Sequence, residues 1–270
     1  MRDTLSTDGR TLSYLDFGGT GRPLLALHGG MSEAAAFTGL AAALGDEWRV
    51  IALDQRGHGD SDRAPHYRRE GYVADAVALL DHLGLTEPVA VLGYSLGGLN
   101  AYHLAAAHPD RVSALIGVDA TVAIDIPAGP QWFDFLGALP YSAPTREELL
   151  GAVDPAALPF VADGVRPLAW GSPQTESGGG SGWRLAFHGQ DMLDSIHACA
   201  GDHWDTWTAG TCPALLIHGR HSRALTQDVA DAMVARRPGT AYTALEGDHF
   251  VPFTDPEGFH CAVGKFLAAL

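Results

Sequence analysis

One stretch of this sequence decides the fold: Val89-Ala90-Val91-Leu92-Gly93-Tyr94-Ser95-Leu96-Gly97-Gly98. Its first four residues are apolar and include two β-branched side chains, which predicts a buried strand, and the alanine-rich residues 99–107 predict a helix. A serine with a glycine two positions away on each side, set between a strand and a helix, is typical of a nucleophile elbow. This is a sharp turn that holds a reactive side chain above a sheet.

The glycine spacing has a steric reason. The turn forces Ser95 into a strained backbone conformation, and a side chain at position 93 or 97 would collide with the adjacent helix or strand. Ser95 is thereby raised above the sheet, and the Leu96 N–H lies at a helix N-terminus, where it meets developing negative charge favourably. The stretch therefore predicts a nucleophilic serine. The alternative is a tight turn whose serine has no chemical role.

The composition is that of a globular protein with a substantial core. The chain has 270 residues, of which 46% are hydrophobic and 18% charged, enough for one large α/β domain or two small ones. We find no apolar run of the ~20 residues that would cross a bilayer and no apolar signal segment after Met1. The three cysteines are widely spaced, which favours free thiols and a cytoplasmic location.

The net charge limits the partners that we expect. A formal charge of −15 disfavours nucleic acid and anionic membrane surfaces. We therefore expect a small-molecule substrate, no nucleic-acid partner and no membrane partner. The oligomeric state stays open, with a homodimer as one option.

Short apolar strands alternate with helices along most of the chain. Strands are expected at residues 11–17, 23–27, 48–53, 89–92, 112–118, 214–217 and 241–245, and helices at 32–44, 70–83, 99–107, 227–235 and 256–269. Because most of these strands are continuously apolar, we predict a mostly parallel sheet with helices on both faces. The active site of such a sheet lies beyond the carboxyl ends of its strands.

The interval 121–210 breaks this alternation. It is rich in proline and holds five of the six tryptophans, which is too much aromatic surface for a disordered linker. We predict a cap over residues 123–208, inserted between two parts of the core, 1–122 and 209–270. Its hydrophobic face, including Trp132, is expected to face the site. Alternatively, these aromatic residues only fasten the cap to the core.

Four motifs together resemble the α/β-hydrolase superfamily, in its esterase, lactonase and C–C-hydrolase branch. They are, in chain order, His28-Gly29-Gly30, Asp54-Gln55-Arg56-Gly57-His58-Gly59-Asp60-Ser61, Ser95 between its glycines, and Gly247-Asp248-His249-Phe250. The resemblance covers nearly the whole chain apart from the cap. It implies a mostly parallel sheet sandwiched by helices, a mainly helical cap, and chemistry without a cofactor.

The resemblance also implies roles for individual residues. Ser95 matches the nucleophile and His249 the general base, a role that suits histidine because its unperturbed pKa lies near working pH. The N–H groups of Gly30 and Leu96 match the oxyanion hole, and the motif at 54–61 is expected to fix loops by hydrogen bonds. His28 is expected to be structural within its loop. The pocket is expected to be bordered by His28, Met31, Tyr94, Trp132 and Phe250.

The acid of the predicted triad has two possible positions. The family often places it in a Gly-x-x-Asp loop, and here the corresponding residues are Gly219-Arg220-His221-Ser222, with serine in place of aspartate. A second position in the family is the end of the preceding core strand, where this chain has Asp119. Two hypotheses stay open: Asp119 is the acid, or Ser222 or a water molecule orients His249.

Three further patterns predict less. His218 and His221 are spaced like a metal-binding pair but lack partner ligands, so we expect no metal site. Residues 18–21 are glycine-rich like a phosphate-binding loop but lack its lysine and helix. A polar cluster either contacts substrate or forms a hydrated edge; it consists of His197, Asp202, His203 and Asp205.

These features favour a serine hydrolase that cleaves a small, largely apolar ester or lactone through an acyl-enzyme. Serine at position 95 argues against the aspartate nucleophile of dehalogenases and epoxide hydrolases, and against a cysteine nucleophile. Two alternatives remain. One is a non-hydrolytic protein of the same fold, either a catalyst of rearrangement or a ligand-binding protein. The other is C–C bond hydrolysis with the same residues.

Overall fold

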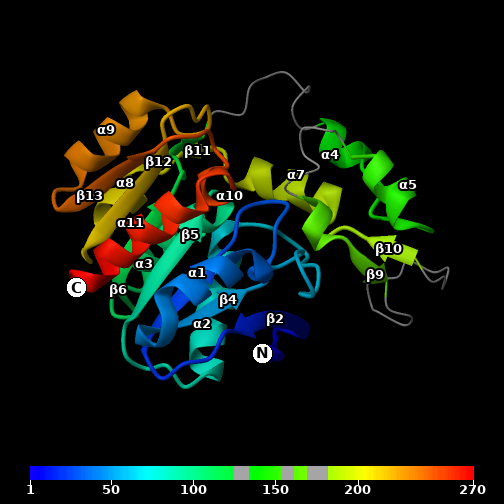
Figure 1. Cartoon of the computed structure of the whole chain (residues 1–270), viewed down its shortest axis with the longest axis horizontal. Coiled ribbons are helices and arrows are strands. Elements are labelled where there is room, and N and C mark those ends of the chain that lie inside the picture. Colours follow the sequence, from blue (N-terminus) through cyan, green and yellow to red (C-terminus); the bar gives the residue numbers. More distant parts are fainter. Residues whose placement is uncertain (125–133, 154–160, 169–181) are drawn as a thin grey trace.

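The computed structural model describes residues 1–124, 134–153, 161–168 and 182–270. Trp132 and Trp170 lie outside these ranges. Within them, a mixed sheet forms the centre of the molecule, helices cover both of its faces, and an inserted segment projects to one side (Figure 1). Among the described residues, no helix has the length and apolarity that crossing a membrane requires.

The described part contains an eight-stranded sheet in the order β1-β2-β4-β3-β5-β6-β12-β13. Its strands are β1 (Arg2–Thr7), β2 (Arg10–Asp16), β3 (Arg22–Leu27), β4 (Trp48–Leu53), β5 (Val89–Tyr94), β6 (Val112–Val118), β12 (Ala214–Gly219) and β13 (Thr240–Leu245). The β1–β2 and β2–β4 pairs are antiparallel and the remaining pairs are parallel. The predicted mostly parallel sheet is confirmed, with β1 as an edge strand that the sequence patterns did not predict.

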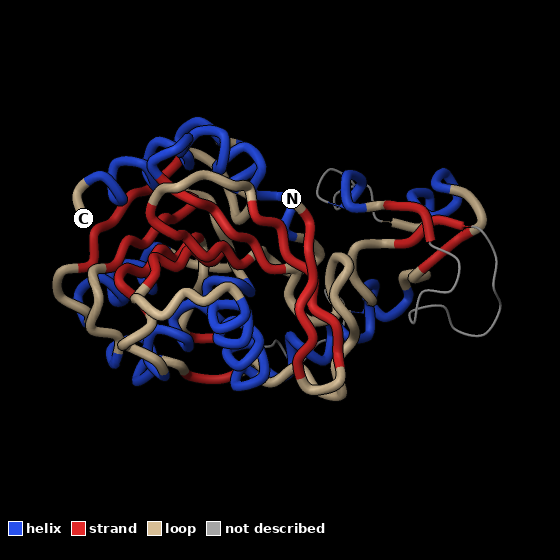
Figure 2. Tube along the Cα trace, turned by 90° about the horizontal axis from the view of Figure 1, so that it is seen from below, coloured by secondary structure: helices blue, strands red, loops and turns tan. Residues whose placement is uncertain are grey.

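Helices pack on both faces of this sheet, as Figure 2 shows edge-on. One face is covered by α1 (Thr38–Leu44) and α11 (Pro256–Ala268), with the short helices η1 (Ala34–Phe37), η2 (Gly45–Glu47) and α10 (Val251–Thr254) nearby. The other is covered by α2 (Arg69–His82), α3 (Leu96–Ala107), α8 (Trp204–Ala209) and α9 (Gln227–Arg236). Along β3, Leu24 and Ala26 join the first core, while Leu25 and Leu27 join the second. Since both faces are buried, the central strands are continuous apolar runs.

The inserted segment carries its own small core and adds short strands to its helices. Its elements are β7 (Ala123–Ile124), α4 (Asp134–Ala138), β8 (Ser142–Ala143), α5 (Arg146–Gly151), η4 (Ala162–Gly164), β9 (Arg166–Leu168), β10 (Gly182–Arg184), α7 (Gly189–Ala198) and β11 (Gly201–Asp202). The strands β8, β10 and β9 form an antiparallel sheet, and β11 pairs with β7. Leu149, Leu185 and Phe187 are among the residues of the insert's core.

Two of the tryptophans in this interval pack against the main domain. Trp207 is 1% exposed within the core of the α2–α3 face, and its indole N–H donates to the Met233 carbonyl at 2.9 Å. Trp204 lies under the Arg236 guanidinium, 4.0 Å from ring centroid to Cζ. These two side chains fasten α8 to the core. This agrees with the alternative expectation that aromatic residues of this interval serve to attach it to the core.

Candidate active site

The turn around Ser95 has the geometry that the glycine spacing predicts. β5 ends at Tyr94 and α3 begins at Leu96, and Ser95 between them has φ of 51° and ψ of −115°. A Cβ at Gly93 would lie 2.1 Å from the Gly97 carbonyl oxygen, and a Cβ at Gly97 would lie 2.0 Å from the Leu27 carbonyl oxygen. Both contacts are with backbone, which cannot move aside, so the steric argument is confirmed.

Backbone strain is concentrated around this turn. Within the described part, four non-glycine residues have positive φ, and three of them are Met31, Ser95 and Asp119. The fourth, Asp8, lies in the β1–β2 hairpin. Because such conformations persist only where the surroundings impose them, their grouping at the carboxyl ends of β3, β5 and β6 marks this edge of the sheet as a candidate site.

His249 bridges Ser95 and Asp119. It follows β13 in the loop before α10, and its Nε2 lies 2.9 Å from the Ser95 Oγ. Its Nδ1 lies 2.7 Å from Asp119 Oδ2. The sequence left open whether Asp119, or Ser222 or a water molecule, orients His249. In the structure the carboxylate of Asp119 contacts the imidazole.

Ser222 contacts the carboxylate rather than the imidazole. Its hydroxyl donates to Asp119 Oδ2 at 2.6 Å, and the Gly219 N–H donates to Oδ1 at 2.9 Å. This is possible because β6 and β12 are neighbours in the sheet, so their carboxyl ends meet. Asp119 is only 1% exposed, and these donors together with His249 satisfy a charge that burial would otherwise destabilise.

The loop after β3 lies beside the serine. A Cβ at Gly29 would lie 3.4 Å from the Ser95 Cβ, and neither the Gly30 N–H nor the Leu96 N–H donates to an acceptor in the described part of the chain. Leu96 is the first residue of α3, where the helix dipole adds partial positive charge. Leu96 directly follows Ser95 in the chain, and Gly30 follows the glycine that approaches the serine, so both unbonded N–H groups belong to residues close to Ser95 in the described part.

His28 fixes the orientation of this loop from beneath. The Gln55 N–H donates to its Nε2 at 3.0 Å, so the ring proton is on Nδ1, which donates to the Gly29 carbonyl at 2.7 Å. Burial and the neighbouring His58 lower the pKa of His28 to about 3, so the ring is neutral. In a trans peptide the C=O and N–H point in opposite directions, so holding the Gly29 carbonyl turns the Gly30 N–H away from His28. His28 has no exposed surface, so it supports the loop. Our expectation that it borders the pocket is therefore wrong.

Of the other residues expected to border the pocket, two lie near His249 and one packs against the inserted segment. Tyr94 is 5% exposed and its ring centroid lies 5.4 Å from that of His249; burial raises the pKa of its hydroxyl well above the usual value, which keeps it protonated. The Phe250 ring lies edge-on to His249 at 5.4 Å between centroids. Met31 packs against the core of the inserted segment. The prediction for Trp132 falls outside the described residues.

Helix α7 of the inserted segment reaches the candidate site. A Cβ at Gly30 would lie 2.3 Å from Met192 Cε, so this methionine covers the glycine. Asp191, the preceding residue, accepts from Arg63 Nε at 2.7 Å and Nη2 at 2.8 Å. Nothing in the sequence marked Met192, because a methionine on a short helix is indistinguishable from a core residue until the helix is placed.

Residues 54–61 fasten the loops at this edge. Asp54 is fully buried and accepts from the N–H groups of Ala34 at 2.7 Å and Asp60 at 3.1 Å. Asp60 also accepts from Arg184 Nη2 at 2.6 Å, and the Gly59 carbonyl accepts from Arg184 Nη1 at 2.9 Å. Arg184 lies on β10 of the inserted segment. Residues 54–61 therefore also hold that segment against the core.

The remaining patterns have local structural partners. His218 has one ring nitrogen 2.8 Å from the Tyr242 hydroxyl and the other 2.9 Å from the Leu225 carbonyl oxygen, which leaves neither for a metal. His203 lies 3.2 Å from His103 of α3, between their ring nitrogens, and 2.8 Å from the Cys199 carbonyl oxygen.

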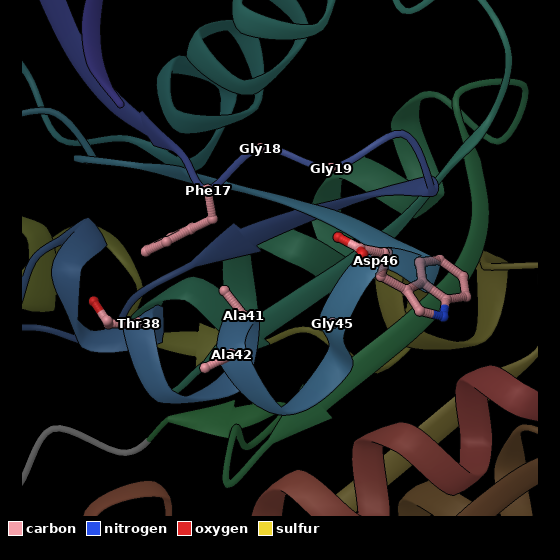
Figure 3. A pocket seen from close by; sticks show the side chains of 9 residues that line it. Phe17, Gly18, Gly19, Thr38, Ala41, Ala42, Gly45 and Asp46 are labelled. Atoms are coloured by element: carbon pink, nitrogen blue, oxygen red, sulfur yellow. The ribbon is translucent and has the colours of Figure 1, made fainter.

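The glycine-rich turn at 18–19 borders a hollow beside α1, whose lining does not include Ser95 (Figure 3). Its volume is about 320 Å³, and its lining includes Thr38, Asp46 and Trp48. Asp46 is the charged side chain among the described residues that line it, and a carboxylate disfavours a phosphate group.

Comparison with known proteins agrees with this architecture. The family model described as "alpha/beta hydrolase fold" matches residues 22–256. This chain belongs to the α/β-hydrolase family. The match extends across β3 to the start of α11 and includes Ser95, Asp119 and His249.

Individual relatives of this α/β hydrolase are themselves hydrolases by name. It is 28% identical to 2-(acetamidomethylene)succinate hydrolase of Mesorhizobium japonicum, over 93% of this chain and 90% of that protein. It is 31% identical to lipase LipV of Mycobacterium tuberculosis, over 86% of this chain and 88% of that protein. A crystal structure of E-2-(acetamidomethylene)succinate hydrolase has the same fold, with a TM-score of 0.79, 24% identity and 99% coverage of both chains. These similarities support hydrolase activity without naming a substrate.

Proposed function

We propose that this α/β hydrolase is a serine hydrolase that cleaves a small, largely apolar carboxylic ester or lactone through an acyl-enzyme. The observation that carries the proposal is the continuous chain of contacts from Ser95 Oγ to His249 Nε2 at 2.9 Å and from His249 Nδ1 to Asp119 Oδ2 at 2.7 Å. Such a chain leaves Nε2 unprotonated and ready to accept the serine proton.

The reaction has two halves, acylation of Ser95 and hydrolysis of the acyl-enzyme, and the same residues act in both. Ser95 Oγ attacks the carbonyl carbon while its proton moves to His249 Nε2, and the resulting oxyanion accepts hydrogen bonds from the Gly30 and Leu96 N–H groups. When the bond to the alcohol oxygen breaks, His249 returns the proton to that oxygen. Water then attacks the acyl carbon and loses a proton to His249. When the bond from that carbon to Ser95 Oγ breaks, His249 returns the proton to Oγ and the acid leaves. Asp119 keeps the imidazole in the required tautomer and stabilises its charged form.

We further propose that residues 123–208 act as a cap on a core made of 1–122 and 209–270. Support comes from Met192 of α7, which covers Gly30, and from the contacts of Arg184 with Gly59 and Asp60. The thioether of Met192 and the partly buried Met31 give the site an apolar side, which favours a substrate of low polarity.

Labelling and turnover test the proposal together. The wild type is expected to react covalently with a fluorophosphonate probe and to hydrolyse p-nitrophenyl acetate and butyrate, because both need an activated serine and oxyanion donors. Ser95→Ala is expected to lose both reactions. A folded wild-type protein that neither takes up the probe nor turns over these esters would reject the proposal and favour a non-hydrolytic, ligand-binding role.

A further inference from the structure

Arg69 is a buried cation without a buried counter-ion. It is 4% exposed, no carboxylate lies within ion-pair distance among the described residues, and its Nε has no hydrogen-bond partner there. It is also the first residue of α2, the helix end at which the dipole disfavours positive charge. By contrast Arg56, 3% exposed, pairs with Asp75 at 2.6 Å. An unpaired buried charge costs stability, so stability alone does not account for Arg69.

The guanidinium of Arg69 connects α7 of the insert with α3 of the core. Its Nη1 donates to Asn100 Oδ1 at 2.7 Å, and its Nη2 donates to Ser195 Oγ at 2.9 Å. Ser195 lies on α7 one turn after Met192, and its Oγ is 2.9 Å from the Tyr72 hydroxyl. The Arg69 Cζ also stacks over the Tyr72 ring, 4.5 Å from its centroid. The guanidinium is therefore held rigidly at the junction of α2, α3 and α7.

A chain of hydrogen bonds continues from Asn100 to the loop beside Ser95. Asn100 Nδ2 donates to Gln55 Oε1 at 2.6 Å, and Gln55 Nε2 donates to the His28 carbonyl at 2.6 Å. The Gln55 N–H donates to His28 Nε2 at 3.0 Å, and His28 Nδ1 donates to the Gly29 carbonyl at 2.7 Å. In every link the donor lies on the side of Arg69 and the acceptor on the side of the loop.

This common direction has an electrostatic consequence. An amide that accepts from a cation at its oxygen becomes a stronger donor at its nitrogen, so hydrogen bonds aligned in one direction reinforce one another. The chain ends on peptide groups of the loop, because the His28 carbonyl shares a peptide with the Gly29 N–H and the Gly29 carbonyl shares one with the Gly30 N–H. The links that start at Arg69 thus polarise the peptide that carries the Gly29 N–H. The peptide that carries the Gly30 N–H is held separately, through the main-chain N–H of Gln55 and the ring of His28.

We propose that Arg69, Asn100 and Gln55 form a relay that holds the loop 28–30 and so positions the Gly30 N–H for the oxyanion, with Arg69 as its positioning residue. The inference rests on the proposed serine-hydrolase function. It also gives α7 two links to the same loop: Met192 covers Gly30 directly, and Ser195 holds the guanidinium from which the relay starts.

The first variant removes the charge at similar length. Arg69→Met is expected to lower kcat for p-nitrophenyl acetate by about tenfold with KM within about twofold of the wild type. The loss is smaller than the 10²–10³-fold cost of deleting an oxyanion donor, because here the donor stays and is only displaced. The affinity for phenylboronic acid, which forms a tetrahedral adduct on serine, is expected to fall in parallel with kcat, whereas a residue that matters only for stability would leave both unchanged.

The second variant separates the relay from packing. Asn100→Asp still accepts from Arg69, and as an ion pair it is expected to keep the melting temperature at or above the wild-type value. Its carboxylate has no N–H to donate to Gln55, so kcat and boronic-acid affinity are expected to fall as in Arg69→Met. Arg111→Met is the matched control, since the Nε of Arg111 also has no hydrogen-bond partner among the described residues, while its Nη2 contacts Asp81 and the Leu85 carbonyl, outside the relay. Its kcat is expected to stay at the wild-type value.

The outcomes separate this inference from the proposed function. Wild-type kcat and boronic-acid affinity in Asn100→Asp would overturn the relay, even if Arg69→Met failed to fold, and would leave the hydrolase proposal standing as long as the wild type reacts with the fluorophosphonate probe. A wild type that does not react at Ser95 would reject the proposed function, and the relay with it.

Discussion

The two sides of His249 are built in different ways. On the serine side, one contiguous run, residues 93–98, contains the strand end, the nucleophile and the helix start. On the acid side, Asp119 from the end of β6 meets Gly219, the last residue of β12, and Ser222, which follows that strand, about a hundred residues further along the chain. Local sterics determine the first geometry, whereas the second exists only because two strands are neighbours in the sheet.

Because of this difference, we expect the two sides of His249 to tolerate amino-acid substitutions differently. On the serine side, a Cβ at position 93 or 97 would lie 2.1 or 2.0 Å from a backbone oxygen, so those glycines have no substitute. On the acid side, a carboxylate and a hydroxyl 2.6 Å apart occupy adjacent strand ends. We therefore expect that an acid at either strand end reaches the same histidine.

The largest effect is expected from Asp119→Asn. The fixed Gly219 N–H would keep the amide oxygen at the Oδ1 position, which turns the amide nitrogen toward His249 Nδ1. His249 would then carry its proton on Nε2 and cease to accept from Ser95, which costs about 10⁴-fold in turnover. Steady-state kinetics on p-nitrophenyl esters measure this loss.

A neighbouring acid supplies the control for this prediction. Asp248 is exposed and accepts from the Phe250 N–H at 2.9 Å, so Asp248→Asn keeps that contact and is expected to retain turnover within about twofold. Full activity of Asp119→Asn across the pH range would remove Asp119 from the proposed mechanism.

A smaller but structural effect is expected on the serine side. Gly97→Ala places a Cβ against the Leu27 carbonyl, and the strain is expected to lower the free energy of unfolding by about 3 kcal/mol. Gly117→Ala on the neighbouring strand β6 is the matched control, because its nearest contact would be an ordinary 3.9 Å from Leu216 Cδ1. Thermal or urea unfolding compares the two. Equal stability of both variants would refute the steric account of the turn.

The smallest effect is expected from Ser222→Ala, which removes one of the donors that orient Asp119. We expect kcat to fall about tenfold with little change in KM, since a charged hydrogen bond contributes roughly 1.5–3 kcal/mol and the remaining donors compensate in part. Ser222→Thr keeps the hydroxyl and is expected to retain most activity.

A double variant tests the exchange of the two acid positions directly. Asp119→Asn with Ser222→Asp moves the carboxylate to the other strand end and is expected to recover about tenfold over Asp119→Asn alone. This is a fraction of the roughly 10⁴-fold loss, because the relocated carboxylate lacks the fixed donors around position 119. No recovery, with the double variant folded, would mean that only position 119 reaches the imidazole.

Much of the fold and part of the candidate site could be predicted from the sequence. Apolar runs with helical segments between them predicted the parallel sheet, and the glycines around Ser95 predicted a turn that the structure confirms. His249 was identified by its place after the last strand. Asn100 carried a signal that could have marked it, since it is a polar residue within an alanine-rich, buried helix. Arg69 carried none, because an arginine at the start of a helix looks like a surface residue.

The sequence by itself determined the layered α/β architecture and the elbow at Ser95, because periodicity and glycine sterics act over a few neighbouring residues. Only the tertiary structure decided that Asp119 contacts His249, that Ser222 holds the carboxylate, and that His28 lies beneath the loop. These outcomes depend on which strand ends are adjacent and on which buried polar groups find partners there. Hydrogen bonds between residues a hundred or more positions apart leave no local pattern in the chain.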